Sequence, residues 1–309
     1  MRIVFMGTPD ISRDVLRAVS AEHEVIGVFC QPDKPVGRKH IITPPPVKVF
    51  AEEAGLPVFQ PKGFRSGKAA QILRELDPDL ILVIAYGRIL PQEVLDIPKL
   101  GCINIHASLL PKYRGAAPIQ RAIINGEKVT GITIMNMSAG MDEGDILAQK
   151  KVVIDPEDTE ETLFSKMGET ACSFILEVLP QIETGTLKGI PQDGELATYA
   201  PPLEKNEGCF TFNKDGRAIV DLVRGMSVWP VAFFNYEGKK VKVAEASYDE
   251  RTGKIGEILS LKPLTVAAAS GAVVLRKLVP EGGKPMDGTA WANGRRFRIG
   301  DIINTSDEC

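Results

Sequence analysis

The sequence predicts an α/β fold, a Rossmann-like, mainly parallel sheet with helices on both faces, followed by a small β-barrel domain. Residues 80–85 and 102–105 are continuous apolar runs without polar alternation, which is typical of strands buried on both faces. Such runs alternate with helical patterns through the first two-thirds of the chain, as expected for a parallel sheet. After residue 206, short β segments with regularly spaced turns predict the barrel. The length of 309 residues suits about two domains.

The elements of the first part follow in order. The first strand is expected over residues 3–6, with Thr8 as the N-cap of the next helix and Pro9 in its first turn. A further helix is expected to end at Gly55. The remaining predicted elements are strands over 24–29, 130–137 and 146–154, and helices over 45–54 and 160–182.

The sequence pattern changes near residue 200, from alternating strand and helix patterns to short β segments, and this change predicts a domain boundary. Tyr199-Ala200-Pro201-Pro202 reads as a linker, because two prolines prevent a helix and remove backbone donors. Beyond it lie one helical pattern and a hairpin signal at Glu237-Gly238. The predicted β segments of this part are 231–236, 241–244, 255–261, 264–268 and 272–278. We therefore expect a first domain over 1–198, a linker over 199–205 and a second domain over 206–309.

Composition and motifs exclude several classes of protein. With 37 basic and 40 acidic residues, the chain is not a highly basic nucleic-acid binder. The five cysteines are widely spaced and form no C-x-x-C, so neither a disulfide framework nor a zinc ribbon is indicated. No H-x-x-x-H or clustered His/Cys pattern suggests a metal.

The apolar runs are too short for a membrane span or a signal peptide. The longest, residues 80–86, falls far short of the ~20 residues that a spanning helix needs. The apolar start over residues 3–6 is too short for a signal-peptide core. We therefore expect a cytoplasmic protein. The G-x-G-x-x-G and G-x-S-x-G motifs are also missing, which argues against a dinucleotide cofactor and serine-hydrolase chemistry.

Asn104 and His106 stand at the end of a predicted strand, before a loop rich in proline and glycine. Ligands of parallel α/β sheets bind outside the carboxyl ends of the strands. Two residues apart in a strand, both side chains share one face. An amide beside an imidazole can stabilise a carbonyl oxygen that becomes an oxyanion. The alternative is that both only satisfy backbone groups near a turn.

Asp142 lies in a second candidate segment, Gly140-Met141-Asp142-Glu143-Gly144-Asp145. Glycines that flank acidic residues can simply mark a tight turn. The functional interpretation is that Asp142 approaches His106, because neighbouring strands bring their ends together. A carboxylate there favours the imidazolium and can accept or relay a proton.

The segment over residues 31–40 is a third candidate. It holds two prolines, one glycine and the cations Lys34, Arg38 and Lys39 between a predicted strand and a predicted helix. It is either a solvated connector or an exposed lid whose cations meet phosphates.

Together these residues resemble the formyltransferase family that uses 10-formyltetrahydrofolate. The likeness rests on Asn104-x-His106, the later Asp142 and the intervening Ser108-Leu109-Leu110-Pro111. It extends over almost the whole length. Further matching segments are residues 2–10, 31–38, 85–91, 101–120 and 140–145.

The resemblance implies transfer of a formyl group to the α-amine of methionine esterified to initiator tRNA. Folate is then a consumed co-substrate, no metal is required, and the protein is expected to be a monomer with an OB-like second domain that contacts tRNA. The implied catalytic residues are Asn104, His106 and Asp142. The implied folate-binding residues are Ser108, Leu109, Leu110, Pro111, Arg88, Ile89 and Leu90, and the implied tRNA contacts are Arg38, Lys34 and Lys39. In the second domain, we expect further contacts from Lys239, Lys240, Lys242, Arg295, Arg296 and Arg298.

Several rival functions keep part of this interpretation. A nucleotide-sugar or glycinamide-ribonucleotide formyltransferase would change only the acceptor. The glycinamide enzyme needs only about the first 200 residues, whereas the run Ala116-Ala117-Pro118-Ile119-Gln120 favours the tRNA acceptor over a sugar. A folate hydrolase would use the same residues but admit water in place of the amine. If the protein were a non-catalytic folate- or RNA-binding module, the occurrence of Asn104, His106 and Asp142 together would be a coincidence.

Overall fold

A computed structural model describes residues 1–37 and 40–304. The chain divides into two compact units. The first comprises Met1–Pro118, Val129–Val153 and Phe164–Ala200, and the second comprises Ile119–Lys128, Ile154–Leu163 and Pro201–Cys309.

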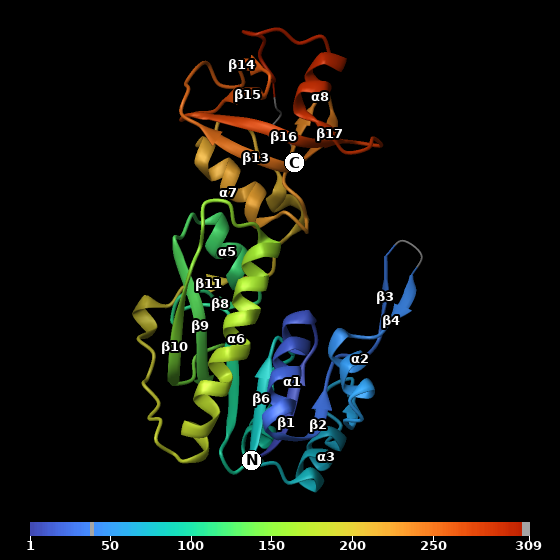
Figure 1. Cartoon of the computed structure of the whole chain (residues 1–309), viewed down its shortest axis with the longest axis vertical. Coiled ribbons are helices and arrows are strands. Elements are labelled where there is room, and N and C mark those ends of the chain that lie inside the picture. The colour runs from blue at the N-terminus through green and yellow to red at the C-terminus, as the bar shows by residue number, and fades with distance from the viewer. Residues whose placement is uncertain (38–39, 305–309) are drawn as a thin grey trace. The chain divides into compact units, whose positions relative to one another are not determined.

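A seven-stranded sheet forms the centre of the first unit (Figure 1). Its strand order is β10-β9-β7-β6-β1-β2-β5. The strands are β1 (Arg2–Gly7), β2 (Glu24–Phe29), β5 (Val58–Phe59), β6 (Leu80–Ile84), β7 (Cys102–His106), β9 (Val129–Asn136) and β10 (Ile146–Val153). The five strands from β7 to β5 pair in parallel, whereas β9 is antiparallel to both β7 and β10. The predicted mainly parallel sheet is confirmed.

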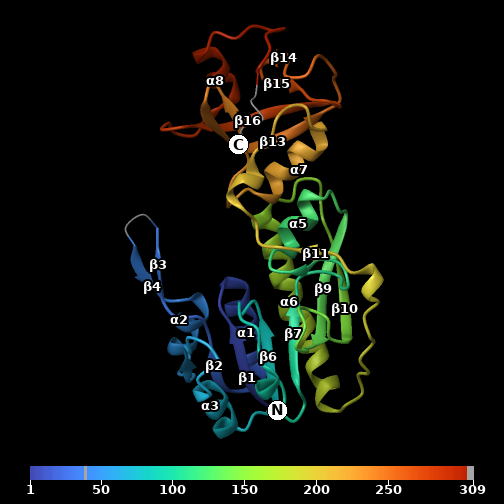
Figure 2. The same cartoon turned by 180° about the vertical axis from the view of Figure 1, so that it is seen from behind.

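Helices cover both faces of this sheet, as predicted (Figures 1 and 2). On one face, α3 (Lys68–Leu76) and α4 (Gln92–Leu95) pack against the apolar side chains of β1 and β6 in a buried cluster. On the other face, α1 (Asp10–Glu22) meets the end of β1, where a Cβ on Gly7 would lie 2.6 Å from Ser12 Cβ. The long helix α6 (Glu160–Glu183) lies beside α1, and α2 (Pro46–Glu53) also contacts α1.

The start of α1 differs from the prediction. Pro9 occupies the N-cap position, and no side chain caps the helix. Thr8 is not the cap, because its hydroxyl donates a hydrogen bond to Tyr86 O at 3.2 Å. The Thr8 hydroxyl thus bonds a carbonyl of the loop after β6, and it does not cap the first backbone N–H groups of α1.

The segment after β2 forms a hairpin of two short antiparallel strands. These are β3 (Lys34–Val36) and β4 (Ile41–Thr43). The sequence suggested either a connector or a lid here, and strands of only three residues give no periodic signal. Lys34 is exposed on β3, whereas Arg38 and Lys39 lie outside the described residues.

The second unit holds an antiparallel β domain, as predicted. Its sheet order is β12-β13-β16-β15-β14, and β17 also pairs with β16. The strands are β12 (Phe233–Tyr236), β13 (Lys239–Asp249), β14 (Ile258–Leu261), β15 (Leu264–Ala267), β16 (Ala272–Pro280) and β17 (Met286–Asp287). The helices α7 (Gly216–Gly225) and α8 (Gly288–Gly294) pack on this sheet, and the short helix η2 spans Lys205–Gly208.

Two earlier stretches of chain belong to the same second unit. The buried Arg224 of α7 donates a hydrogen bond to Asp158 O at 2.7 Å. The buried carboxylate of Glu160 accepts from Gln120 of α5 (Pro118–Ile124) at 3.0 Å and from Val228 N at 3.1 Å. The predicted functional division into 1–198, 199–205 and 206–309 stays a prediction.

No helix among residues 1–37 and 40–304 is long and apolar enough to cross a membrane.

Gly131 of β9 offers a test of the packing between β9, β10 and the loop after β7. A Cβ there would clash with Lys150 O and lie 2.6 Å from Leu109 Cδ2. We expect Gly131→Ala to lower the free energy of unfolding by about 1–3 kcal/mol, the usual cost of overpacking. Gly194→Ala is the control, since a Cβ there meets nothing within 4 Å. Urea denaturation of both variants measures the difference, and equal stabilities would contradict this packing.

Candidate active site

Asn104 and His106 lie on the face of β7 that carries α3 and α4. Cys102, two residues before Asn104, belongs to the buried cluster on that face, so the alternation of the strand places all three side chains there. His106 is buried, with 6% of its surface exposed, and Asn104 is half-buried. Among the residues that the structure describes, the Asn104 amide has no hydrogen-bond partner. It is therefore available to a ligand.

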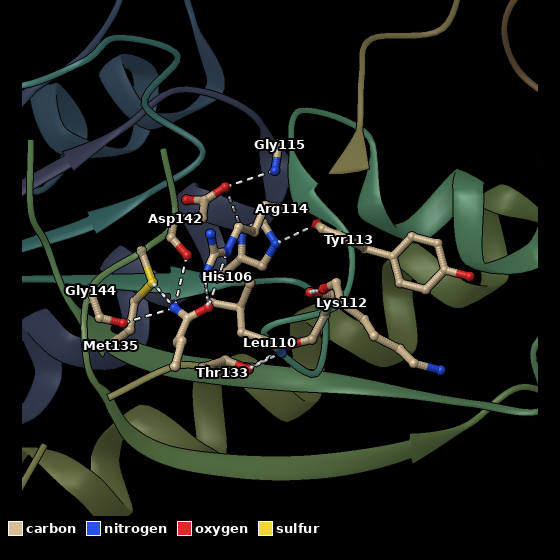
Figure 3. Close-up of polar contacts among 12 residues, drawn as sticks. His106, Leu110, Lys112, Tyr113, Arg114, Gly115, Thr133, Met135, Asp142 and Gly144 are labelled. Carbon is tan, nitrogen blue, oxygen red and sulfur yellow. Dashed lines mark hydrogen bonds and ion pairs between the residues drawn. The ribbon is translucent and has the colours of Figure 1, made fainter. Parts of the chain in front are cut away.

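The His106 ring is fixed by a backbone carbonyl. Its Nε2 lies 2.9 Å from Tyr113 O (Figure 3). A carbonyl oxygen only accepts hydrogen bonds, so Nε2 carries a proton. Tyr113 is itself held in the left-handed region, at φ +62°, and its N–H donates to Thr198 Oγ1 at 2.9 Å. The nitrogen left for chemistry is Nδ1.

Asp142 approaches that remaining nitrogen. Its Oδ2 lies 3.6 Å from His106 Nδ1 and accepts a hydrogen bond of 2.8 Å from Gly115 N. The carboxylate is mostly buried, at 16% exposure, so the contact is only weakly screened by water. Asp142 also adopts a left-handed backbone, at φ +53°, which is uncommon for a residue with a side chain.

The two residues meet, but not for the reason expected from the sequence. Because β9 is antiparallel to β7, its last residues lie beside the start of β7, where Met137 N donates to Cys102 O at 2.8 Å. The loop that follows β9 must return along β7 to bring Asp142 to His106. The expectation that neighbouring strand ends meet is therefore wrong here, although the predicted pair is correct.

Two residues that the sequence analysis missed hold this loop. Gln192 donates from Nε2 to Asp142 O and to Gly144 O, both at 2.8 Å. Its Oε1 accepts from Arg114 Nη2 at 2.8 Å and from Arg114 Nε at 3.1 Å. Gln192 lies in a segment without any motif, so only the three-dimensional structure reveals it.

The loop over residues 108–111 is held from within by Thr133. The Thr133 hydroxyl donates to Ser108 O at 2.6 Å and accepts from Leu110 N at 3.1 Å. Ser108 and Leu110 are buried, whereas Leu109 and Pro111 are half-buried. A ligand at this loop would thus meet Leu109, Pro111 and backbone atoms.

Arg88, Ile89 and Leu90 follow the carboxyl end of β6, the strand next to β7. Arg88 and Ile89 line an open cleft of about 1150 Å³ that also carries Lys62 and Arg65. The Arg88 Nε is buried without a hydrogen-bond partner among the described residues. Leu90 is only 1% exposed and packs in the core, so it can reach a ligand only through its backbone.

The base of the β3–β4 hairpin is anchored by Asp33. Its carboxylate accepts hydrogen bonds from Gln60 Nε2 at 2.8 Å and from Lys48 Nζ at 2.9 Å. These bonds, that from Gln60 first, hold the pKa of Asp33 below its ordinary value. The hairpin that carries Lys34 thus projects from a fixed base.

No group of three or more His, Cys, Asp or Glu side chains in the described part of the chain could hold a metal ion. The expectation of a metal-free reaction stays a prediction.

Family models match both parts of the chain. Residues 1–179 match the model described as formyl transferase, and residues 202–296 match the model described as formyl transferase, C-terminal domain. A methionyl-tRNA formyltransferase of Macrococcus caseolyticus is 45% identical over 300 residues, which cover 96% of this chain and 97% of the relative. A methionyl-tRNA formyltransferase of Desulfotalea psychrophila is 43% identical, over 99% of this chain and 96% of the relative.

A solved structure shares the fold. It is the N-formyltransferase of Helicobacter canadensis in complex with folinic acid and dTDP-3-aminofucose, with a TM-score of 0.69 and 16% identity over 89% of this chain and 98% of that one. At this identity the likeness concerns the fold alone. The family models and the near full-length relatives establish more: this chain belongs to the formyl transferase family and is a formyl-transferring enzyme.

Proposed function

We propose that this enzyme transfers the formyl group of 10-formyltetrahydrofolate to the α-amine of methionyl initiator tRNA, giving formylmethionyl-tRNA for translation initiation. The observation that carries the proposal is the fixed group of Asn104, His106 and Asp142 at the end of β7. The relatives at 43% and 45% identity that bear the methionyl-tRNA formyltransferase name support this acceptor.

Asn104 and His106 stabilise the negative charge that develops on the formyl oxygen. Attack of the neutral amine on the formyl carbon forms a C–N bond and moves an electron pair onto that oxygen. The Asn104 amide is free to donate to it, and His106 can donate only from Nδ1, because Nε2 is bound to Tyr113 O. Nδ1 donates only when the ring is doubly protonated, so the proposed mechanism places a charged imidazole beside the Asp142 carboxylate, whose Oδ2 lies 3.6 Å from Nδ1.

Asp142 holds the charged imidazole and accepts the proton that the attacking amine releases, directly or through water. Collapse of the intermediate breaks the bond between the formyl carbon and N10 of the folate. The amine proton then passes to N10, so that tetrahydrofolate leaves neutral at that nitrogen. Each step uses groups that lie within the contacts of Figure 3 or beside them on β7.

The folate is proposed to lie between the 108–111 loop and the Arg88–Ile89 segment, which follow neighbouring parallel strands. Carboxyl ends of such strands share one edge of the sheet, the usual place for ligands of this fold. The cleft beside Arg88 carries Lys62 and Arg65, cations that suit the carboxylates of the glutamate part of folate.

The tRNA is proposed to contact two basic regions, each within one unit. The β3–β4 hairpin presents Lys34. Arg38 and Lys39 lie outside the described residues and are proposed as contacts from the sequence alone. In the second unit, burial and the neighbouring Lys205 and Lys242 lower the pKa of Lys240. Like charges this close are relieved by an anion, which suits a phosphate contact. Both Lys240 and Arg295 also contact aromatic rings: Lys240 Nζ lies 3.4 Å from the centroid of the Phe233 ring, and the Arg295 guanidinium lies 4.3 Å from that of Trp291. We further propose that the enzyme acts as a monomer in the cytoplasm.

A formyl-transfer assay tests the function. Methionine-charged initiator tRNA, uncharged tRNA, a dTDP-amino sugar and buffer are each mixed with 10-formyltetrahydrofolate. We expect formylation of charged tRNA only, and a loss of about 100-fold or more in kcat for His106→Ala and Asp142→Asn, the scale of acid–base and charge stabilisation. His23→Ala is the matched control. Tetrahydrofolate release at the same rate without charged tRNA would contradict the tRNA acceptor.

The two substrate sites are separable by their KM values. We expect Arg88→Ala to raise KM for the folate by about tenfold or more, the loss of one charged hydrogen bond, with KM for the tRNA unchanged. Lys34→Ala and Arg38→Ala should raise KM for the tRNA alone. Each should also reduce by about one the slope of log affinity for the tRNA against log salt concentration. Lys188→Ala removes an exposed cation elsewhere and serves as control. An increase in the wrong KM would contradict the assignment.

A further inference from the structure

Gln192 sits behind the proposed catalytic group, and neither the family resemblance nor the comparisons assign it a role. It lies in the extended stretch between α6 and the short helix η1 (Gly194–Leu196). From there its side chain reaches the loop that carries Asp142, which lies 50 residues earlier in the sequence.

The Gln192 amide uses its whole hydrogen-bonding capacity in this position. Both donors of Nε2 are taken by carbonyl oxygens, those of Asp142 and Gly144, each at 2.8 Å. The acceptor Oε1 receives the Nε and Nη2 donors of Arg114. A glutamine offers both donors and an acceptor on one planar group, and no other side chain of this size except asparagine does so.

The two carbonyls that Gln192 binds flank a strained turn. Asp142 has φ +53°, and such a conformation persists only where its surroundings over-determine it. Among the residues that the structure describes, one backbone donor holds the Asp142 carboxylate, Gly115 N at 2.8 Å. Without the bonds from Gln192, the turn can relax, and the carboxylate then moves away from His106 Nδ1.

Arg114 fixes the orientation of the Gln192 amide. Its side chain is buried, at 7% exposure, and its Nη1 lies 3.6 Å from the half-exposed Glu143 carboxylate. Since an arginine only donates, it forces Oε1 of Gln192 toward itself and Nε2 toward the loop. The hydrogen bonds therefore run in one direction: Arg114 donates to Gln192 Oε1, and Gln192 Nε2 donates to the carbonyl oxygens of the loop.

We propose that Gln192, oriented by Arg114, is a positioning residue of this enzyme: it holds residues 142–144 in the conformation that aims the Asp142 carboxylate at His106. This inference rests on the proposed function for its kinetic readout, and the residue acts through Asp142 without touching substrate. Gln192→Glu tests it most sharply. The introduced carboxylate can still accept the hydrogen bonds from Arg114, but it cannot donate to the carbonyl oxygens of Asp142 and Gly144.

The first measurement is kinetic. We expect Gln192→Glu to lower kcat by about 100-fold, as a misplacement of about 1 Å does, with both KM values within about threefold of the parent. Gln192→Met, which has a similar volume and no charge, should lose kcat in the same way. It stands in if the glutamate variant does not fold. Gln181→Glu is the matched control, since Gln181 is exposed on α6 and its side-chain amide donates to Glu177 O at 3.0 Å, within the same helix.

A double-mutant cycle separates positioning from a general loss of structure. If Gln192 acts through Asp142, adding Gln192→Glu to Asp142→Asn should lower kcat by less than about threefold further. A full additional loss in the Asp142→Asn background would overturn the proposal. So would a kcat of Gln192→Glu and Gln192→Met within about threefold of the parent, while the parent formylates charged tRNA.

The second measurement does not depend on activity. The Gly115 amide donates to Asp142 Oδ2, so its hydrogen exchange reports where the carboxylate lies. We expect exchange at Gly115 to be at least about tenfold faster in Gln192→Glu and unchanged in Gln181→Glu. Unchanged exchange in Gln192→Glu would overturn the proposal even if the enzyme proved to use another acceptor. Faster exchange in an enzyme that does not formylate tRNA would leave the positioning role standing and remove the proposed function alone.

Discussion

The contact between His106 Nε2 and the carbonyl of Tyr113 is the constraint on which the site depends. This hydrogen bond occupies one ring nitrogen, Nε2, and the other, Nδ1, faces Asp142. The carbonyl is placed by an unusual backbone at Tyr113, which is held in turn by Thr198. Because both partners of the ring belong to residues with left-handed backbone, local strain is concentrated at the proposed catalytic site, and hydrogen bonds from Thr198 and Gln192 compensate for it.

The change from parallel to antiparallel pairing at β9 explains why the loop that carries Asp142 needs such support. A parallel neighbour would have placed its own carboxyl end next to His106. The antiparallel β9 instead sends a returning loop to that place, and such a loop needs support along its length. Gln192 supports its backbone, and Gly115 supports its carboxylate. The proposed active site is thus assembled from β7 and three further stretches: the loop after β7, the loop after β9 and the segment that carries Gln192 and Thr198.

Regular periodicity made much of this architecture predictable. Unbroken apolar runs identified β6 and β7, and the two-residue spacing of Asn104 and His106 placed both on one face. The pairing of His106 with Asp142 followed from the residue type of Asp142 and the family resemblance. The expectation that the ends of neighbouring strands bring them together was wrong, because a local sequence pattern does not show whether two strands run parallel or antiparallel. Tyr113 O and Gln192 were missed for a related reason. One acts through a backbone atom and the other through long-range contacts, and neither leaves a periodic signal. The β3–β4 hairpin was missed because each strand is only three residues long, too short for a periodic pattern, and the first contains a proline.

The ring nitrogens of His106 give the most direct test of the central constraint. Nitrogen-15 spectra of the ring, assigned with His23→Gln and His40→Gln variants, report which nitrogen carries a proton. The structure predicts that Nε2 of His106 carries the proton of the neutral ring, because Tyr113 O accepts a hydrogen bond from that nitrogen. A neutral His106 with its proton on Nδ1 and a bare Nε2 would contradict this, and with it the assignment of Nδ1 as the nitrogen that serves the reaction.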